Sequence, residues 1–241
     1  MHSCANHCAN YRTNYRTNHW VNHEHSMSVR LHHLTYFVSP GGSEHKLLNQ
    51  MGLAAGAPAA HPGQGTQGLP YHFRSSFLEL AWVDDEEPLS SPASVALHQL
   101  ARTRWPEHEG NPFILVLTRD NNDVPLPTRE MKAPGQPPMP IAVGDNVDRL
   151  DEPLVLVLPM GAGVPSPAAG VRTQSEIGLT SITCLELTLP QPPSETVLAL
   201  AATGLVRLRK GPLAHVFVEA DGGRRGQRLD LAPLLHIGFL V

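Results

Sequence analysis

The chain has 241 residues, of which 41% are hydrophobic and 17% charged, with a formal net charge of −4 and a pI near 6.4. This composition is typical of a globular protein with a sizeable core. It excludes a basic surface for nucleic acid, and no apolar run reaches the roughly 18 residues that span a bilayer. We therefore expect a cytoplasmic protein that binds neither nucleic acid nor membrane.

Residues 3–22 repeat a pattern of four residues in which asparagine returns at every fourth position. The segment has little aliphatic content and no signal-peptide core, so we expect residues 1–27 to be a disordered extension before a functional start at Met27. A small zinc site is the alternative, and its ligands would be Cys4, Cys8, His19 and His23. However, ten residues separate the two pairs, where about twelve are usual, and the loop lacks the hydrophobic pair of a finger core.

The first predicted strand covers residues 29–38, and a helix over 43–51 follows it. Strict alternation places His33 on one face with Leu31, Thr35 and Phe37. A histidine on a strand is usually a satisfied polar residue. The alternative is that His33 faces a cleft.

The motif His-Pro-Gly-Gln-Gly-Thr at residues 61–66 follows the second strand. Its two glycines permit a tight backbone and close approach of a ligand. The imidazole of His61, the amide of Gln64 and the hydroxyl of Thr66 could contact a bound group, or the motif could be only a hairpin turn.

The strand over residues 77–83 carries the residue that most needs an explanation. Alternation puts Leu78, Leu80 and Trp82 on a core face, and it puts Glu79 on the other face between Phe77 and Ala81. Burying an unpaired carboxylate costs several kcal/mol. Glu79 must therefore reach solvent in a cleft or have a partner such as a metal or a base.

The middle of the chain contains a helix over residues 92–105 and strands over 113–117 and 154–158. Its prolines between residues 124 and 140 predict a lid or an irregular edge rather than a helix. This region is longer than a simple connection needs, so we interpret residues 111–175 as an insertion and connector.

The predicted elements of the final third of the chain repeat the pattern of the first third. A strand over 177–189, a helix over 194–203 and hairpin strands over 205–209 and 214–219 precede the tripeptide Leu-Asp-Leu at 229–231, which matches Leu-Glu-Leu at 78–80. The alignment sets Thr183 opposite His33 and Asp230 opposite Glu79. The alignment also matches His215 with His72. Cys184 alternates onto the same side of its strand as Ile182, so we expect it to be a buried structural thiol.

The strand at residues 33–38, the motif at 61–66 and the strand Phe-Leu-Glu-Leu at 77–80 resemble a glyoxalase-like domain of the vicinal oxygen chelate superfamily. The resemblance covers most of residues 28–241. It implies an α+β fold in which two βαβββ modules, at about 28–110 and 176–241, form an open, curled mixed sheet around a site.

The resemblance also implies a divalent-metal site. Each module would give one ligand from its first strand and one carboxylate from its last, so the ligands here would be His33, Glu79 and Asp230. Thr183, at the fourth position, departs from the family pattern. The remaining set would suit weakly held Mn²⁺, Mg²⁺ or Zn²⁺, or no metal at all.

Three functions follow as hypotheses. The first is a metal-dependent lyase or isomerase that acts on a small oxygen-bearing substrate, with Glu79 or His33 in catalysis. The second is a metal-free module that binds or sequesters a small molecule, and the third is a metal-free enzyme with His33 and Glu79 as an acid–base pair. We expect a small-molecule ligand and consider a homodimer. The predicted substrate-binding residues are Phe37, His61, Gln64, Thr66, His72, Phe77 and His215.

Overall fold

The structure is a computed structural model that describes residues 29–40, 43–104, 110–121, 124–135, 137–164, 167, 171–230 and 236–241. For residues 228–230 it describes the backbone. The expected extension and the alternative zinc site, at residues 1–27, lie outside the described residues. Within the described part of the chain, no helix is both long and apolar enough to cross a membrane.

The first layer is an eight-stranded mixed sheet with the order β2-β3-β4-β1-β5-β8-β7-β6. Its strands are β1 (Val29–Phe37), β2 (Ala59–His61), β3 (Thr66–His72), β4 (Phe77–Val83), β5 (Phe113–Arg119), β6 (Thr128–Lys132), β7 (Pro140–Gly144) and β8 (Leu154–Val157).

This order has an internal symmetry. β1 is parallel to β4 and β5 is parallel to β8, while β1 and β5 meet antiparallel at the centre. The sheet therefore consists of two similar four-stranded halves. Residues 113–157, which belong to the expected insertion and connector, form the second half of this sheet.

The second layer is a five-stranded sheet with the order β10-β9-β11-β13-β12. Its strands are β9 (Ile182–Leu189), β10 (Val206–Lys210), β11 (His215–Ala220), β12 (Arg228–Asp230) and β13 (Ile237–Leu240). β9 pairs directly with β10, whereas β1 pairs with the last strand of its unit. The final third thus does not repeat the connectivity of the first, and it does not complete the first sheet. Cys184 on β9 is a buried free thiol, as expected.

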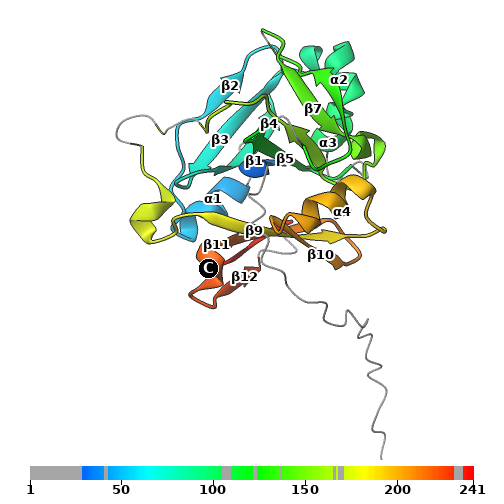
Figure 1. The fold of residues 1–241 in the computed structure, drawn as a ribbon. Coiled ribbons are helices and arrows are strands. Elements are labelled where there is room, and N and C mark those ends of the chain that lie inside the picture. Colours follow the sequence, from blue (N-terminus) through cyan, green and yellow to red (C-terminus); the bar gives the residue numbers. More distant parts are fainter. Residues whose placement is uncertain are drawn as a thin grey trace, which may run out of the picture.

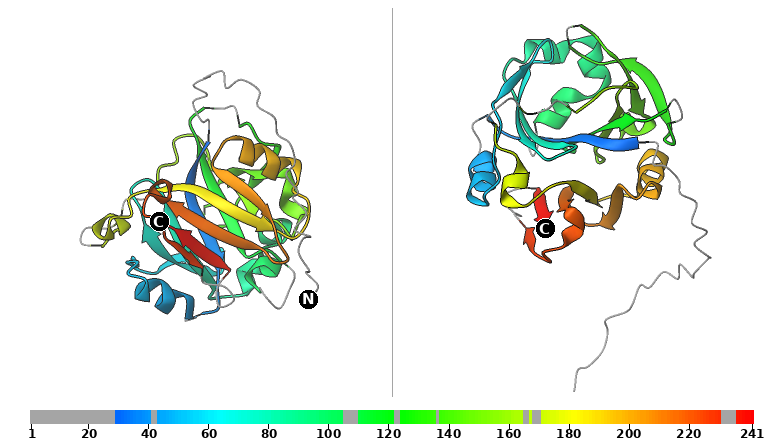
Figure 2. Two further views of the ribbon diagram at one scale, coloured as in Figure 1. Left: turned by 90° about the horizontal axis from the view of Figure 1, so that it is seen from below. Right: turned by 60° about the vertical axis from the view of Figure 1, so that its left-hand side comes forward.

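Helices occupy the edges of the two layers and the top of the first. The α-helices are α1 (Ser43–Gln50), α2 (Pro92–Ala96), α3 (Gln99–Thr103) and α4 (Glu195–Ala202). The short 3-10 helices are η1 (Glu87–Ser90), η2 (Asp145–Asp148), η3 (Gln174–Ile177) and η4 (Asp221–Gly223). Figure 1 shows α1 and α4 on opposite sides, between the layers, and the right view of Figure 2 shows α2 and α3 across the first sheet from the second.

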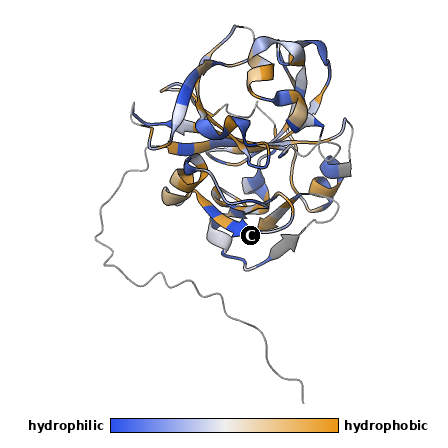
Figure 3. Ribbon diagram, turned by 90° about the vertical axis from the view of Figure 1, so that its right-hand side faces the viewer, coloured by the Kyte–Doolittle hydropathy of each residue, from blue (hydrophilic) through white to orange (hydrophobic). Residues whose placement is uncertain are grey.

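One face of the first sheet forms the main core with the second sheet. Leu78 and Leu80 of β4 belong to this core, together with Leu185 and Leu187 of β9. Figure 3 shows the hydrophobic stretches of the strands in both layers. Phe77, Glu79 and Ala81 of β4 lie on the opposite face. The predicted alternation of this strand is therefore confirmed.

Strand β1 departs from strict alternation at His32, the first of its two adjacent histidines. The register with β5 shifts between Leu31 and His33, which leaves His32 without a paired residue, as in a β-bulge. Leu31 consequently joins the core instead of sharing the face of His33.

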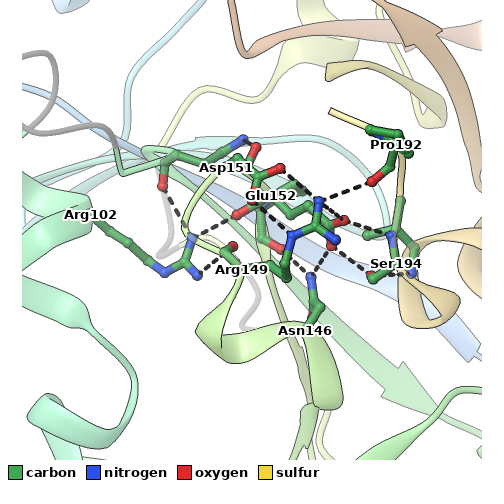
Figure 4. Close-up of polar contacts among 10 residues, drawn as sticks. Arg102, Asn146, Arg149, Asp151, Glu152, Pro192 and Ser194 are labelled. Atoms are coloured by element: carbon green, nitrogen blue, oxygen red, sulfur yellow. Dashed lines mark hydrogen bonds and ion pairs between the residues drawn. The ribbon is translucent and has the colours of Figure 1, made fainter. Parts of the chain in front are cut away.

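A buried polar network connects the two layers (Figure 4). Glu152 is fully buried, and its carboxylate accepts hydrogen bonds from Ser194 N and Ser194 Oγ, both at 2.6 Å, and from Asn146 Nδ2 at 3.0 Å. Ser194 is the N-cap of α4, so this carboxylate holds α4 against the first layer. Arg102 of α3, also fully buried, donates to the carbonyls of Glu152 and Val147 at 2.7 and 3.1 Å.

Candidate functional site

The face of the first sheet that turns away from the second layer encloses a cavity of about 510 Å³. Two rows of side chains cross its floor, because paired residues of adjacent strands point to the same side of a sheet. The first row, over β3, β4, β1, β5 and β8, is Pro70, Glu79, Thr35, Ile114 and Leu154. The second row, over the same strands, is His72, Phe77, His33, Val116 and Leu156. The polar groups of both rows lie in the first half of the sheet, and the second half gives aliphatic side chains.

The carboxylate of Glu79 has partners from two other strands. Its Oε1 atom accepts a hydrogen bond from His61 Nε2 at 3.3 Å, and its Oε2 atom accepts one from Thr35 Oγ1 at 3.0 Å. Gly68 on β3 makes room for this side chain, because a Cβ atom there would overlap Oε1. Of the two kinds of partner expected for Glu79, a metal or a base, the structure supplies a base.

Glu79 and His61 form an ion pair in the wall of the cavity. Burial alone would raise the pKa of Glu79, but the hydrogen bond from His61 and the nearby imidazoles bring this pKa below its usual value. Burial would lower the pKa of His61, but the hydrogen bond and charge of Glu79 raise it overall. When His61 is protonated, it also donates from Nδ1 to Thr66 Oγ1 at 2.9 Å. Each partner thus shifts the pKa of the other toward its charged form, and the pair carries no net charge when His61 is protonated.

The hydrogen bonds of the two neighbouring histidines fix their tautomers. Burial lowers the pKa of His33 to about 4, and burial also lowers the pKa of His32, so both rings are neutral at pH 7. His32 Nε2 lies 3.1 Å from the carbonyl oxygen of Gly163, which can only accept, so Nε2 carries the single proton of His32. His32 Nδ1 must then accept from His33 Nδ1 at 2.7 Å. The remaining nitrogen of His33, Nε2, is left with a lone pair on a ring that lines the cavity and stacks on Phe77.

The structure brings most of the predicted substrate-binding residues to this cavity. Its lining includes Phe37, His61, Gln64, Thr66, His72 and Phe77. The Nδ1 atom of His72 is buried without a hydrogen-bond partner.

Two predicted site residues belong to the other layer. His215 lies on β11 and the backbone of Asp230 lies on β12, both in the five-stranded sheet. Thr183 is there as well, and it donates to the carboxylate of Glu219 at 3.1 Å. The structure therefore does not bring these residues of the last third to the sheet of His33 and Glu79, whose other half is residues 113–157.

The donor set of the cavity does not fit the expected divalent metal. Both carboxylate oxygens of Glu79 accept hydrogen bonds, and both ring nitrogens of His61 are in hydrogen bonds with Glu79 and Thr66. From the second half of the sheet, Ile114, Val116 and Leu154 line the cavity with apolar side chains, which cannot bind a metal. Among the described residues, no group of three or more His, Cys, Asp or Glu side chains is placed to hold a metal ion. We therefore derive no step that passes through a metal.

Sequence reasoning missed two contributions to the cavity. Thr35 was placed on the correct face, but its hydrogen bond with Glu79 was not foreseen. Gln99, at the start of α3, lines the cavity with its Oε1 atom buried and unpartnered. In the sequence, Gln99 is a polar residue near the apolar stripe of the helix predicted over residues 92–105. That helix was predicted as continuous, whereas the structure divides it into α2 and α3 at His98.

Comparison with known proteins supports the fold class and leaves the function open. No family model and no curated protein matches the sequence. A hypothetical protein from Staphylococcus aureus has a similar fold, with a TM-score of 0.51, 7% sequence identity, and coverage of 88% of this chain and 98% of that chain. The chain is thus an α+β protein that consists mainly of strands in open mixed sheets. At this identity the similarity concerns the fold alone.

Proposed function

We propose that this is a glyoxalase-like protein that binds a small, uncharged, mostly apolar organic molecule with a hydroxyl group, without a metal. The observation that carries the proposal is the division of the cavity floor into two halves. The first half contributes His33, whose Nε2 keeps a lone pair, and the second half, from β5 and β8, is aliphatic. The volume of about 510 Å³ suits a small ligand, since such pockets measure roughly 300–1,000 Å³.

The charges around the cavity favour an uncharged ligand. Glu79 and protonated His61 neutralise each other, the pKa of His61 is raised by Glu79, and His33 is neutral at pH 7. A charged ligand would lose its hydration on entry without an opposite charge to replace it. A hydroxyl group, in contrast, would donate to His33 Nε2 while its apolar body contacts Ile114 and Leu156.

The acid–base properties of His33 and Glu79 disfavour the hypothesis that these two residues act as a catalytic acid–base pair. A general base is most effective when its pKa lies near the working pH. The pKa of His33 is lowered by burial to about 4, and the pKa of Glu79 lies below its usual value. Both groups are weak proton acceptors at neutral pH, yet they remain good acceptors of hydrogen bonds.

The strand order supports the glyoxalase-like assignment. Two four-stranded halves, β2-β3-β4-β1 and β5-β8-β7-β6, each place their first strand parallel to their last. This is the arrangement that two paired βαβββ modules would have, although no α-helix lies between β5 and β6 in the described residues. Among the described residues, those of β5 and β8 that line the cavity are all aliphatic, which supports binding without a metal.

The test is a binding titration of protein treated with a chelator. 2-Naphthol and naphthalene are compared by calorimetry, because they differ only in the hydroxyl group. We expect saturable binding of one molecule per chain, with a Kd about threefold to tenfold lower for 2-naphthol, the gain of one hydrogen bond. Added Mn²⁺, Mg²⁺ or Zn²⁺ should leave both Kd values unchanged.

Two variants locate the site. Ala81→Phe, on the buried floor of the cavity, should abolish binding, whereas Leu213→Phe, at a position that is 56% exposed, should not. His33→Leu should bind both compounds with equal affinity. Binding that appears only with added metal, or that survives Ala81→Phe in a folded protein, would contradict the proposal.

A further inference from the structure

A second polar group faces the cavity from the helical side. Gln99 begins α3, is 5% exposed and lines the cavity. Its Oε1 atom is buried and makes no hydrogen bond, although buried amide oxygens nearly always have a partner. An unpaired acceptor in such a place destabilises the folded protein unless something else meets it. The Oε1 atom exposes less than 1 Å², so a bound molecule would meet it once the Gln99 amide turns toward the cavity.

The backbone before Gln99 is bent in a way that brings it to the cavity. His98 adopts the left-handed conformation, with φ 50° and ψ 36°, and it separates α2 from α3. Residues two apart on a continuous helix point to nearly opposite sides. Leu97 and Gln99 nevertheless both line the cavity, because the left-handed residue lies between them.

The bend is held from outside the cavity. A non-glycine residue in the left-handed region is strained, and such strain persists where the surrounding structure enforces it. His98 Nε2 hydrogen-bonds to Asp148 Oδ1 at 2.8 Å, and Leu97 belongs to the hydrophobic cluster of Phe37 and Ile114. The chain thus keeps an unfavourable backbone and an unpartnered oxygen in the same place.

We propose that Gln99 is a second recognition group, whose Oε1 accepts a hydrogen bond from a donor on the bound molecule. This inference rests on the proposed function and narrows the ligand class. His33 Nε2 and Gln99 Oε1 are both acceptors, so the preferred ligand has two O–H or N–H donors on an apolar body. Aromatic diols are the simplest probes of this class.

The experiment compares one and two donors on the same ring system. 2-Naphthol is titrated beside 2,6-dihydroxynaphthalene, and 4-phenylphenol beside 4,4′-biphenol, so that two donor separations are sampled. In the parent protein, the diol of at least one pair should bind about threefold to tenfold more tightly than its mono-alcohol. Gln99→Leu should remove this preference, so that the diol and its mono-alcohol bind with equal affinity.

A structural role of Gln99 would give a different result. Gln99→Leu removes an unpaired oxygen, so the free variant should be as stable as the parent or more stable, while a structural residue would lose stability. Gln67→Leu on β3, outside the cavity, serves as the matched control and should keep the diol preference. If mono-alcohols bind but neither diol gains, or if Gln99→Leu retains the gain, the role of Gln99 is wrong and the proposed function stands. If no compound binds at the site blocked by Ala81→Phe, both are wrong.

Discussion

The neutral state of His33 predicts a specific dependence of stability on pH. Burial lowers the pKa of His33 from 6.5 to about 4. Between these pH values the unfolded chain binds a proton that the folded protein does not accept, so the free energy of unfolding falls as the pH falls. Since a tenfold change in proton affinity is worth about 1.4 kcal/mol, the loss should approach about 3 kcal/mol at pH 4.

The variant His33→Gln isolates this contribution, because it removes the titrating ring and keeps a polar side chain. We expect the stability difference between parent and variant to shrink by about 3 kcal/mol between pH 7 and pH 4. Urea unfolding at several pH values, followed by circular dichroism, measures the difference. The control is Gln67→Leu on β3. This substitution removes no titrating group, so its difference from the parent should stay constant over the same range.

Nuclear magnetic resonance gives an independent check on the same residue. The ¹⁵N shifts of the His33 ring should report a protonated Nδ1 and an unprotonated Nε2 at pH 7. A ring that titrates near pH 6.5, or a stability difference that does not change with pH, would refute the reasoning.

Two further substitutions test the supports of the site. Gly68→Ala should displace the Glu79 carboxylate, lower the free energy of unfolding by about 1–3 kcal/mol and weaken 2-naphthol binding. Gly163→Ala, where a Cβ atom would meet nothing within 4 Å, should change neither, and equal stabilities of the two variants would contradict this account. Glu152→Gln should lower the unfolding free energy by about 3 kcal/mol, since it disturbs a fully buried charged network. The exposed Glu130→Gln should stay within about 0.5 kcal/mol in the same urea assay, and a similar small effect for Glu152→Gln would argue against the network.

The local features of the first third could be predicted because alternation and burial agree there. Leu78 and Leu80 identify the core face of β4, so Glu79 had to lie on the cavity face. The partnership of Glu79 with His61 could not be read from spacing, since it depends on the register of β2 against β3. The side of the sheet on which Leu31 lies could not be predicted either, because a bulge at His32 breaks the alternation without any change in composition.

The second half of the first sheet was missed for a physical reason. Ile114 and Leu154 continue the row of Thr35 and Glu79 into the second half of the sheet, and an apolar pair carries no sign of a site. The match of Leu-Asp-Leu with Leu-Glu-Leu was therefore given too much weight. The proline-rich segment was expected to be irregular, but Pro140 is the first residue of β7, where a strand tolerates proline.

The buried network around Glu152 makes the two layers depend on each other. The carboxylate of Glu152, which lies just before β8, accepts a hydrogen bond from Ser194 N at the N-cap of α4. The side chain of Arg102 donates to the backbone carbonyl of Glu152. A chain that ended between β8 and η3 would leave the Glu152 carboxylate without its partner Ser194. It would also expose to water the side chains of β1 and β5 that face the main core. Neither layer can then be released as an independent unit. The chain behaves as a single cooperative body, in which loosening the second sheet also loosens the frame that positions the cavity.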